Sequence, residues 1–349
     1  MKLSFSIIKF TFITFLLFVS IDFLAGKYIY NKFIRTGFVD MDTSFAIRDD
    51  VYDHKFSPSF KGISGWGNIR VEYCTDTNGF RSSCENQYRN LKKFDIGFLG
   101  DSFTEAVGVD FNKSFVGIIS ANLQNKKIAN LAVSSYSPSI YFAKSNFLLS
   151  QGYKFNEIIV FVDIGDIVDD TVCYELDENV VKRRETYKYC FRENNERQKK
   201  IIKYLQRKFK LSYELYSQIK IRLVKYGLLS YQLSDSQINH PRSNWIRNYQ
   251  SKNYNNYTYD EASNILLFNM KKLAILLKNN NVALSIAVYP WPGTLKYDSE
   301  NNKHLKLWKN FCVLNCKNFY NLMKPFYNLL EKEDATYIIR KYYIKNDVH

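Results

Sequence analysis

The sequence predicts an α/β protein in which helices cover both faces of a parallel sheet and one N-terminal helix spans a membrane. Short apolar runs typical of buried strands alternate with stretches of helical periodicity from about residue 94 onward. A separate, almost wholly apolar run occupies residues 7–25. With 349 residues, of which 46% are hydrophobic, the chain is long enough to bury a large core.

Composition excludes several other classes of protein. The 14 glycines and 6 prolines are too few for a collagen-like chain, and the hydrophobic content is too high for a disordered one. The formal net charge of +15 raises the question of nucleic acid. However, the densest basic run, residues 197–210, carries apolar residues at helical spacing, which favours a solvated helix face over a site for an anionic surface. We therefore predict no nucleic-acid partner.

Residues 7–25 predict a membrane anchor, because about 19 residues of helix at 1.5 Å each just cross the bilayer core. The residues around Ala25 and Gly26 form a poor cleavage site and cations follow at once, which favours an uncleaved helix. A cleaved signal peptide and a buried core helix are the alternatives. Residues 1–34 are accordingly assigned to an anchor whose partner is the lipid bilayer.

After an irregular segment, strands and helices alternate in the pattern of a doubly wound α/β sheet, which we call the wound pattern. Residues 35–93 show no helical period and contain glycines that mark turns, which predicts an irregular lead-in. The following residues run strand, helix, strand, helix, strand. The first helix has apolar positions between residues 111 and 123, and the second begins at Pro138 and ends before Gly152. The predicted strands are residues 95–100, 128–132 and 157–163.

An insertion divides this pattern. Residues of about 171–261 are polar, basic and rich in tyrosine, and we interpret them as a mostly helical insertion or lid. Residues 94–349 are therefore predicted to form one α/β domain that the insertion interrupts. The pattern resumes with a helix, a strand, a kink, a helix and a strand, at residues 266–277, 282–289, 290–292, near Trp308 and at 319–322.

A candidate nucleophile lies at the carboxyl end of the first predicted strand. The run Gly-Asp-Ser-Phe-Thr-Glu occupies residues 100–105, and open α/β sheets place their sites at such strand ends. Ser102 is therefore in a nucleophile's position, although a serine also needs a neighbouring base and donors for the oxyanion. The alternative interpretation is that Asp101 or Ser102 only caps the following helix.

The run at residues 100–105 resembles the Gly-Asp-Ser block of the SGNH/GDSL hydrolase superfamily. The resemblance implies a flavodoxin-like three-layer SGNH fold in which Ser102 attacks esters. The turn Asn-Gly-Phe-Arg at residues 78–81 resembles a structural turn that precedes this block in membrane-anchored members. In the second block the family places a glycine whose backbone N–H binds the oxyanion. Ser135 stands there with an N–H of its own, which adds to that of Ser102.

The third block departs from the family pattern. The family expects an Asn-Asp pair there, and its asparagine side chain is a further oxyanion donor. In this chain Gly165 replaces the asparagine while Asp166 keeps the last position. The side-chain donor is therefore missing or comes from elsewhere, and Gly165 remains the third candidate residue of the oxyanion hole.

The catalytic base is predicted at the end of the chain, which reads Asn-Asp-Val-His over residues 346–349. Residues two apart in an extended segment point to the same side, so Asp347 could orient the imidazole of His349 toward Ser102. This spacing resembles a variant in membrane-linked polysaccharide acetylation proteins. It completes a predicted Ser-His-Asp triad.

The other three histidines are weaker candidates for the base. His304 lies in a helical pattern and is interpreted as a surface or packing residue. His54 and His240 are expected in polar loops without a carboxylate pattern around them.

The predicted function is that of a serine esterase that acts on ester bonds, with acyl groups of an extracytoplasmic glycan or another small ester as substrate. An O-acetyltransferase of cell-envelope polysaccharide is the second hypothesis, since a sugar hydroxyl can replace water in resolving an acyl-enzyme. The third is an inactive glycan-binding module, which Gly165 favours. The sequence carries no metal-ligand cluster, phosphate loop or dinucleotide motif, so neither a metal nor a cofactor is predicted.

The cysteines indicate the compartment. An even number in neighbouring pairs suits local disulfides in an oxidising space, and buried free thiols are the alternative. Together with the anchor, this predicts a membrane protein whose catalytic domain is periplasmic or at the cell surface. The six cysteines pair by proximity as Cys74 with Cys84, Cys173 with Cys190, and Cys312 with Cys316.

We also expect the chain to be a truncated form of a longer protein. A catalytic histidine at the last position has nothing beyond it to hold its loop, and chain ends are usually poorly ordered. Relatives with this block continue into a further helix, so the final segment of this chain is expected to fray.

Overall fold

The computed structural model divides the chain into two compact units. Met1–Asp40 with Arg192–Gln232 form one, and Met41–Phe191 with Leu233–His349 form the other. The larger, second unit contains the α/β fold and all the predicted site residues. The residues whose structure is described are 2–29, 45–66, 69–85, 88, 90–190, 208–212, 215, 216, 219, 223, 235–252 and 256–349.

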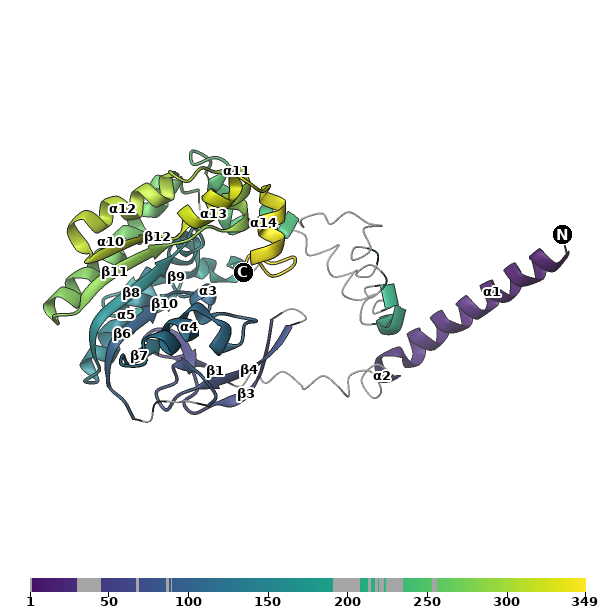
Figure 1. Ribbon diagram of the computed structural model, residues 1–349, viewed down its shortest axis with the longest axis horizontal. Coiled ribbons are helices and arrows are strands. Elements are labelled where there is room, and N and C mark those ends of the chain that lie inside the picture. Colours follow the sequence, from purple (N-terminus) through teal and green to yellow (C-terminus); the bar gives the residue numbers. More distant parts are fainter. Residues whose placement is uncertain are drawn as a thin grey trace. The chain divides into compact units, whose positions relative to one another are not determined.

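Five parallel strands form the centre of the larger unit (Figure 1). They are β6 (Lys93–Leu99), β7 (Ile128–Asn130), β8 (Lys154–Val162), β11 (Ala283–Val288) and β12 (Asn318–Asn321). All four pairings among these strands are parallel. Across the sheet they follow the order β7-β6-β8-β11-β12, which is 2-1-3-4-5 in chain order and typical of a doubly wound sheet. The predicted α/β class and its parallel strands are confirmed.

The lead-in segment is more regular than predicted. It contains β1 (Ala46–Asp49), β2 (Asp53–Phe56), β3 (Lys61–Trp66), β4 (Ile69–Thr75) and β5 (Arg81–Ser82). The strands β5, β4 and β3 extend the main sheet beyond β7 with antiparallel pairing, while β1 and β2 form a separate pair. The prediction of an irregular lead-in is therefore wrong. These strands are short and mostly half-exposed, so no local apolar pattern marks them in the sequence. Their strand structure depends on their pairing partners instead.

Helices cover both faces of the sheet. Successive strand residues point to opposite faces, so on β8 Val160 belongs to the larger apolar cluster and Phe161 to the smaller one. Helix α4 (Phe115–Asn122) packs on the smaller cluster, and α5 (Pro138–Ser150) and α10 (Tyr259–Asn279) contribute to the larger. The predicted three-layer arrangement of helix, sheet and helix is therefore present.

Capping residues explain where the helices begin. The predicted helix over residues 111–123 is divided, because Ser114 accepts a hydrogen bond from the Gly117 N–H at 3.0 Å and starts α4 there. Thr258 and Glu261 form a capping box that starts α10 at Tyr259, within the residues assigned to the insertion. The remaining helices of the wound pattern are α11 (Pro292–Tyr297), α12 (Lys303–Asn315), α13 (Met323–Leu330) and α14 (Ala335–Tyr342).

The insertion is not uniformly helical. It begins with a hairpin of β9 (Tyr174–Asp177) and β10 (Val180–Arg183), so the helical prediction is wrong for this part. Later it contains the short helix α9 (Asp235–Ile238). Most of residues 191–234, including most of the basic run, lies outside the described residues.

The smaller unit contains the apolar N-terminal helix. Helix α1 (Lys2–Ile21) continues through a π-helical turn (Asp22–Gly26) into α2 (Lys27–Ile29). The stretch Lys9–Gly26 is long and apolar enough to cross a membrane, and only 11% of it is buried. That exposure argues against the alternative of a buried core helix.

All six cysteines form the disulfides that their spacing predicted. The pairs are Cys74–Cys84, Cys173–Cys190 and Cys312–Cys316. The alternative of buried free thiols is thereby contradicted, and the pairs fit an oxidising, extracytoplasmic compartment.

Candidate active site

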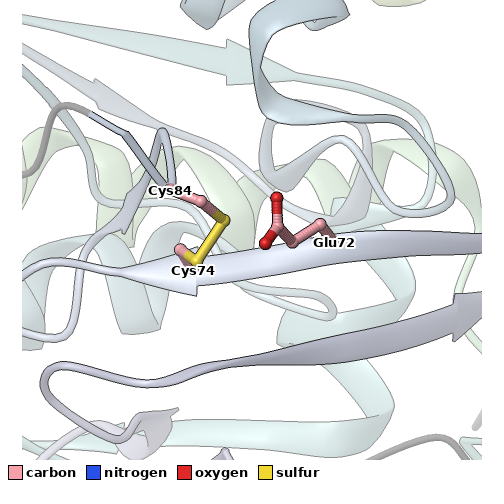
Figure 2. A group of neighbouring side chains, drawn as sticks. All are labelled: Glu72, Cys74 and Cys84. Carbon is pink, nitrogen blue, oxygen red and sulfur yellow. A yellow bond between two sulfur atoms is a disulfide. The ribbon is translucent and has the colours of Figure 1, made fainter. Parts of the chain in front are cut away.

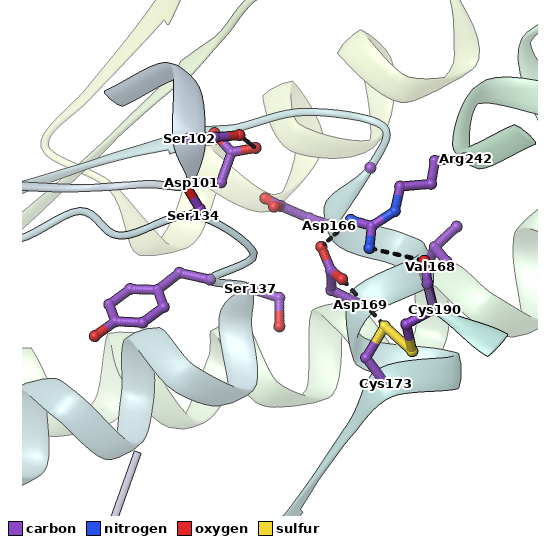
Figure 3. Close-up of polar contacts among 12 residues, drawn as sticks. Asp101, Ser102, Ser134, Ser137, Asp166, Val168, Asp169, Cys173, Cys190 and Arg242 are labelled. Atoms are coloured by element: carbon purple, nitrogen blue, oxygen red, sulfur yellow. Dashed lines mark hydrogen bonds and ion pairs between the residues drawn. A yellow bond between two sulfur atoms is a disulfide. The ribbon is translucent and has the colours of Figure 1, made fainter. Parts of the chain in front are cut away.

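Ser102 opens the short helix α3 (Ser102–Glu105), which follows the carboxyl end of β6. The N-cap of this helix is Asp101, whose carboxylate accepts a hydrogen bond from the Phe103 N–H at 3.0 Å. A Cβ on Gly100 would lie 2.2 Å from the Thr104 hydroxyl, so the tight turn requires glycine. The capping role thus falls to Asp101, and the Ser102 hydroxyl lies 3.3 Å from Oδ2 of the same aspartate (Figure 3).

The other end of α3 is held by Arg81, which comes from the turn at residues 78–81. This side chain is buried, and its guanidinium lies among the carbonyls that follow the helix. Arg81 therefore helps to fix the helix that carries Ser102, which fits the structural role expected for the turn. The acceptors are the backbone oxygens of Glu105, Ala106 and Val109.

The structure brings Ser102 together with the last residues of the chain. Nε2 of His349 lies 2.6 Å from Oγ of Ser102, and Nδ1 of the same ring contacts Oδ1 of Asp347. When Nδ1–H donates to the carboxylate, Nε2 of the neutral ring is the atom that can accept from the serine hydroxyl. Burial raises the pKa of Asp347, but hydrogen bonds and charge from His349, with a hydrogen bond from Trp66, outweigh burial and leave that pKa below its ordinary value.

Contacts from several elements hold the terminal segment in place. Val348 is buried in the main apolar cluster, and Gln237 donates to the Ile344 carbonyl at 3.1 Å. The His349 ring lies 4.6 Å from Phe103 and 4.9 Å from Trp66 between centroids. The segment that was expected to fray is thus packed in this structure, because its apolar and aromatic side chains have partners.

Two of the predicted oxyanion residues offer backbone donors. The N–H groups of Ser102 and Ser135 have no protein acceptor among the described residues. Ser135 has φ +64°, the left-handed conformation that glycine adopts most readily. Its neighbour Ser134 donates from both N–H and Oγ to Oε2 of Glu105, at 2.7 and 2.6 Å, which fixes this loop against α3.

Gly165 does not offer such a donor. Its N–H is hydrogen-bonded to Oδ1 of Asp163 at 2.6 Å. A Cβ at this position would lie 2.8 Å from the Trp291 indole, so an asparagine side chain would collide with that ring. The structure therefore does not support the prediction that Gly165 contributes to the oxyanion hole.

A buried acidic cluster, absent from the sequence predictions, lies next to Ser102. The carboxylates of Asp101, Asp163 and Asp166 lie within 4.8 Å of one another, and Figure 3 shows Asp101 and Asp166 near Ser102. Burial, and then the charge of Asp163, raise the pKa values of Asp101 and Asp166 well above the ordinary range. Both carboxyls therefore hold protons at pH values where exposed carboxyls have lost them.

Asp169 connects this region to a disulfide. Its carboxylate accepts from Arg242 at 2.8 Å and lies 3.2 Å from the sulfur of Cys173, which is bonded to Cys190 (Figure 3). Burial raises the pKa of Asp169 to about 7 even though Arg242 opposes this rise. The disulfide thus secures the start of the insertion beside the site.

Among the described residues, ligand atoms that could hold a metal ion cluster in two places, and both already have contacts within the protein. Glu72 lies beside Cys74 and Cys84, but Figure 2 shows that these two sulfurs are bonded to each other, so neither is a thiolate ligand. The oxygens of the acidic cluster could hold a hard cation. However, the Tyr289 hydroxyl already contacts Asp163 at 2.6 Å and Asp101 at 3.0 Å.

The other histidines differ in their surroundings. His304 is buried between Tyr259 and Trp308, and burial lowers its pKa to about 3, which confirms a packing role. His54 lies on β2 and contacts the Asp53 carboxylate at 2.8 Å, so the expectation of no carboxylate near it is wrong. His240 packs edge-on against Trp291 at 5.3 Å.

Sequence reasoning missed two aromatic residues that support the triad and the cluster. Trp66 supports Asp347 and His349 from β3, and Tyr289 joins Asp101 to Asp163 from the end of β11. Neither lies in a recognisable motif, so only the fold identifies them. No protein-family model and no curated protein sequence matches the chain. The geometry therefore carries the functional argument.

Proposed function

We propose that this chain is a membrane-anchored serine esterase of the SGNH/GDSL type, with Ser102 as nucleophile, His349 as general base and Asp347 orienting the base. The observation that carries this proposal is the 2.6 Å contact between Oγ of Ser102 and Nε2 of His349, in a ring whose Nδ1 faces Asp347. Such an arrangement lets an otherwise weakly nucleophilic serine lose its proton during attack.

Two further observations support the family assignment. The strand order 2-1-3-4-5 is the flavodoxin-like order, and Ser102 follows the carboxyl end of the first of these strands. The Gly-Asp-Ser-Phe-Thr-Glu run at residues 100–105 and the closing Asp-x-His resemble blocks of this superfamily in the expected order. Together they favour an SGNH-type esterase over a helix cap that happens to contain serine.

The proposed reaction follows from these positions. Oγ of Ser102 attacks the ester carbonyl while its proton passes to Nε2 of His349, and the carboxylate of Asp347 stabilises the imidazolium. The imidazolium then protonates the leaving alcohol, and water resolves the acyl-enzyme with His349 again as base. The N–H groups of Ser102 and Ser135 are the donors we assign to the oxyanion.

The proposed substrate is an acyl ester of an extracytoplasmic glycan. The apolar N-terminal helix and the three disulfides fit a domain tethered on the oxidising side of a membrane. An O-acetyltransferase is the second candidate, because the two-residue spacing of Asp347 and His349 resembles that of polysaccharide acetylation proteins. In that reaction a sugar hydroxyl replaces water in the second step.

Active-site labelling and ester turnover test the proposal. A fluorophosphonate probe should label Ser102 in the full-length protein, and p-nitrophenyl acetate should be hydrolysed. Ser102→Ala should abolish labelling, and His349→Ala should reduce turnover by about 10²–10⁴-fold. Ser150→Ala, which changes an exposed serine on α5, is the matched control. Labelling of another residue, or full turnover by Ser102→Ala, would show that the assignment is wrong.

Adding an acceptor sugar separates the two candidate activities. An esterase should release the same amount of free acetate with and without the sugar. A transferase should instead form acetylated sugar at the expense of free acetate.

A further inference from the structure

A cavity of about 260 Å³ is lined by residues that neighbour the triad, Trp66 among them. This volume is many times the roughly 10–15 Å³ that one water molecule requires. Strands β1, β2 and β3, the turn after α3 and the loop after β7 line it. Most of its wall is apolar, and the main apolar side chains are Phe45, Phe56, Trp66, Val107 and Val133.

Three elements of the candidate site also form this wall. Glu105, which lines the cavity, ends the helix that Ser102 begins. Ser134, also in the wall, directly precedes the candidate oxyanion residue Ser135. Trp66 lines the cavity while its ring packs edge-on against His349 at 4.9 Å and its indole bonds Asp347. The cavity wall thus includes neighbours of the nucleophile, of the candidate oxyanion residue and of the base.

The ionisable groups of the wall are already paired within the protein. Glu105 accepts from the Tyr73 hydroxyl at 3.0 Å and twice from Ser134. The His54 ring contacts Asp53 through Nδ1 and the Ser134 carbonyl through Nε2, each at 2.8 Å. A polar guest would therefore lose its hydration without gaining these partners, whereas an alkyl group would only leave water.

We propose that this cavity binds an alkyl portion of the ester substrate. The inference rests on the proposed esterase function and narrows its substrate class to esters that carry a chain longer than a methyl group. Each methylene that leaves water on binding should raise kcat/KM by roughly fourfold. The chain could belong to the acyl group or to the alcohol, and both sources share this chemistry.

Two substrate series, assayed with the full-length protein in lipid nanodiscs, distinguish the sources. In the acyl series, p-nitrophenyl butyrate is compared with p-nitrophenyl acetate. In the alcohol series, butyl acetate is compared with methyl acetate by acid release. The expected result is a gain of at least about tenfold in kcat/KM for the longer member of one series. Equal kcat/KM values in both series would overturn the proposal.

A cavity-filling substitution links the gain to this cavity. Val107→Phe should reduce the ratio of the longer to the shorter ester toward one, because the added ring occupies the space. Val313→Phe makes the same change at a site that is 76% exposed on α12 and should keep the wild-type ratio. If Val107→Phe does not fold, Ala46→Phe introduces the ring from the exposed β1 position that also lines the cavity. If the folded variant keeps the wild-type ratio of kcat/KM between the longer and the shorter ester, the alkyl group does not bind in this cavity.

Direct binding separates this inference from the proposed function. Butyramide, which an esterase does not hydrolyse readily, is titrated into Ser102→Ala protein with and without the cavity-filling substitution. Binding that the substitution abolishes, in a protein that hydrolyses no ester, would leave the cavity assigned and the esterase function wrong. Ester hydrolysis without chain-length preference and without butyramide binding would leave the function standing and the cavity inference wrong.

Discussion

Replacing Asp347 by asparagine should reduce ester turnover by between about 10-fold and 10⁴-fold. Oδ1 of Asp347 faces both Nδ1 and the backbone N–H of His349, and the Trp66 indole also donates to this carboxylate. A hydrogen bond to a charged group contributes about 1.5–3 kcal/mol, which corresponds to roughly 10- to 150-fold in rate. The larger losses arise if the amide NH₂ faces Nδ1, because the ring then carries its proton on Nε2 and cannot accept from Ser102.

The assay is the initial rate of p-nitrophenyl acetate hydrolysis, measured together with the rate at which a fluorophosphonate labels Ser102. Asp334→Asn is the matched control, because Asp334 caps α14 in the same terminal part of the chain and asparagine caps equally well. The control should remain within about twofold of the wild-type rate. An Asp347→Asn rate equal to wild type would refute the reasoning. An equal loss in the control would attribute the effect to disturbance of the terminal segment.

Burial lowers the pKa of Lys144 from the ordinary 10.5 to about 7, so the unfolded chain keeps this proton to higher pH. Between these two pH values the free energy of unfolding should rise by about 1.4 kcal/mol per pH unit. Lys144→Met should remove that slope from urea unfolding curves, and an unchanged slope would contradict the assignment. The pKa of Asp166 is raised in the folded protein, so its contribution to folding stability is lost as pH rises. Asp166→Asn should therefore raise the melting temperature more at pH 8 than at pH 5. An equal effect at both pH values would exclude a buried proton there. Protein from native envelopes should show no reactive thiols when denatured without reductant, and six would contradict the disulfides. Carbonate washing should leave the full chain in membranes and release a form lacking residues 2–29, whereas release of both would contradict the anchor.

The wound domain could be predicted closely because its elements are periodic. The strand predicted at residues 157–163 is β8 (Lys154–Val162), and the helix predicted to begin at Pro138 is α5 (Pro138–Ser150). Buried strands are continuous apolar runs, and the helices that cover them carry apolar residues at helical spacing. Both can therefore be recognised from the local sequence. The strands of residues 46–82 were not predicted, because short, mostly half-exposed strands have no comparable pattern.

The candidate site was predictable only in part. The run at residues 100–105 indicated Ser102 because a tight turn with glycine and a capping aspartate is a local feature. The assignment of Gly165 to the oxyanion hole was an expectation from the family resemblance alone. Whether its N–H is free depends on the orientation of the Asp163 side chain and on Trp291, and neither follows from spacing.

By itself the sequence determined the α/β class, the apolar N-terminal helix, the disulfide pairs and the candidate residues Ser102, Asp347 and His349. Only the tertiary structure decided that Ser102 and His349, 247 positions apart, meet at 2.6 Å. It also decided that Trp66 supports Asp347 and His349, and that carboxylates from two strand ends gather beside the serine. The reason is physical: periodicity and turn chemistry act over a few residues, whereas these contacts depend on strand order and on how the terminal segment packs against the sheet.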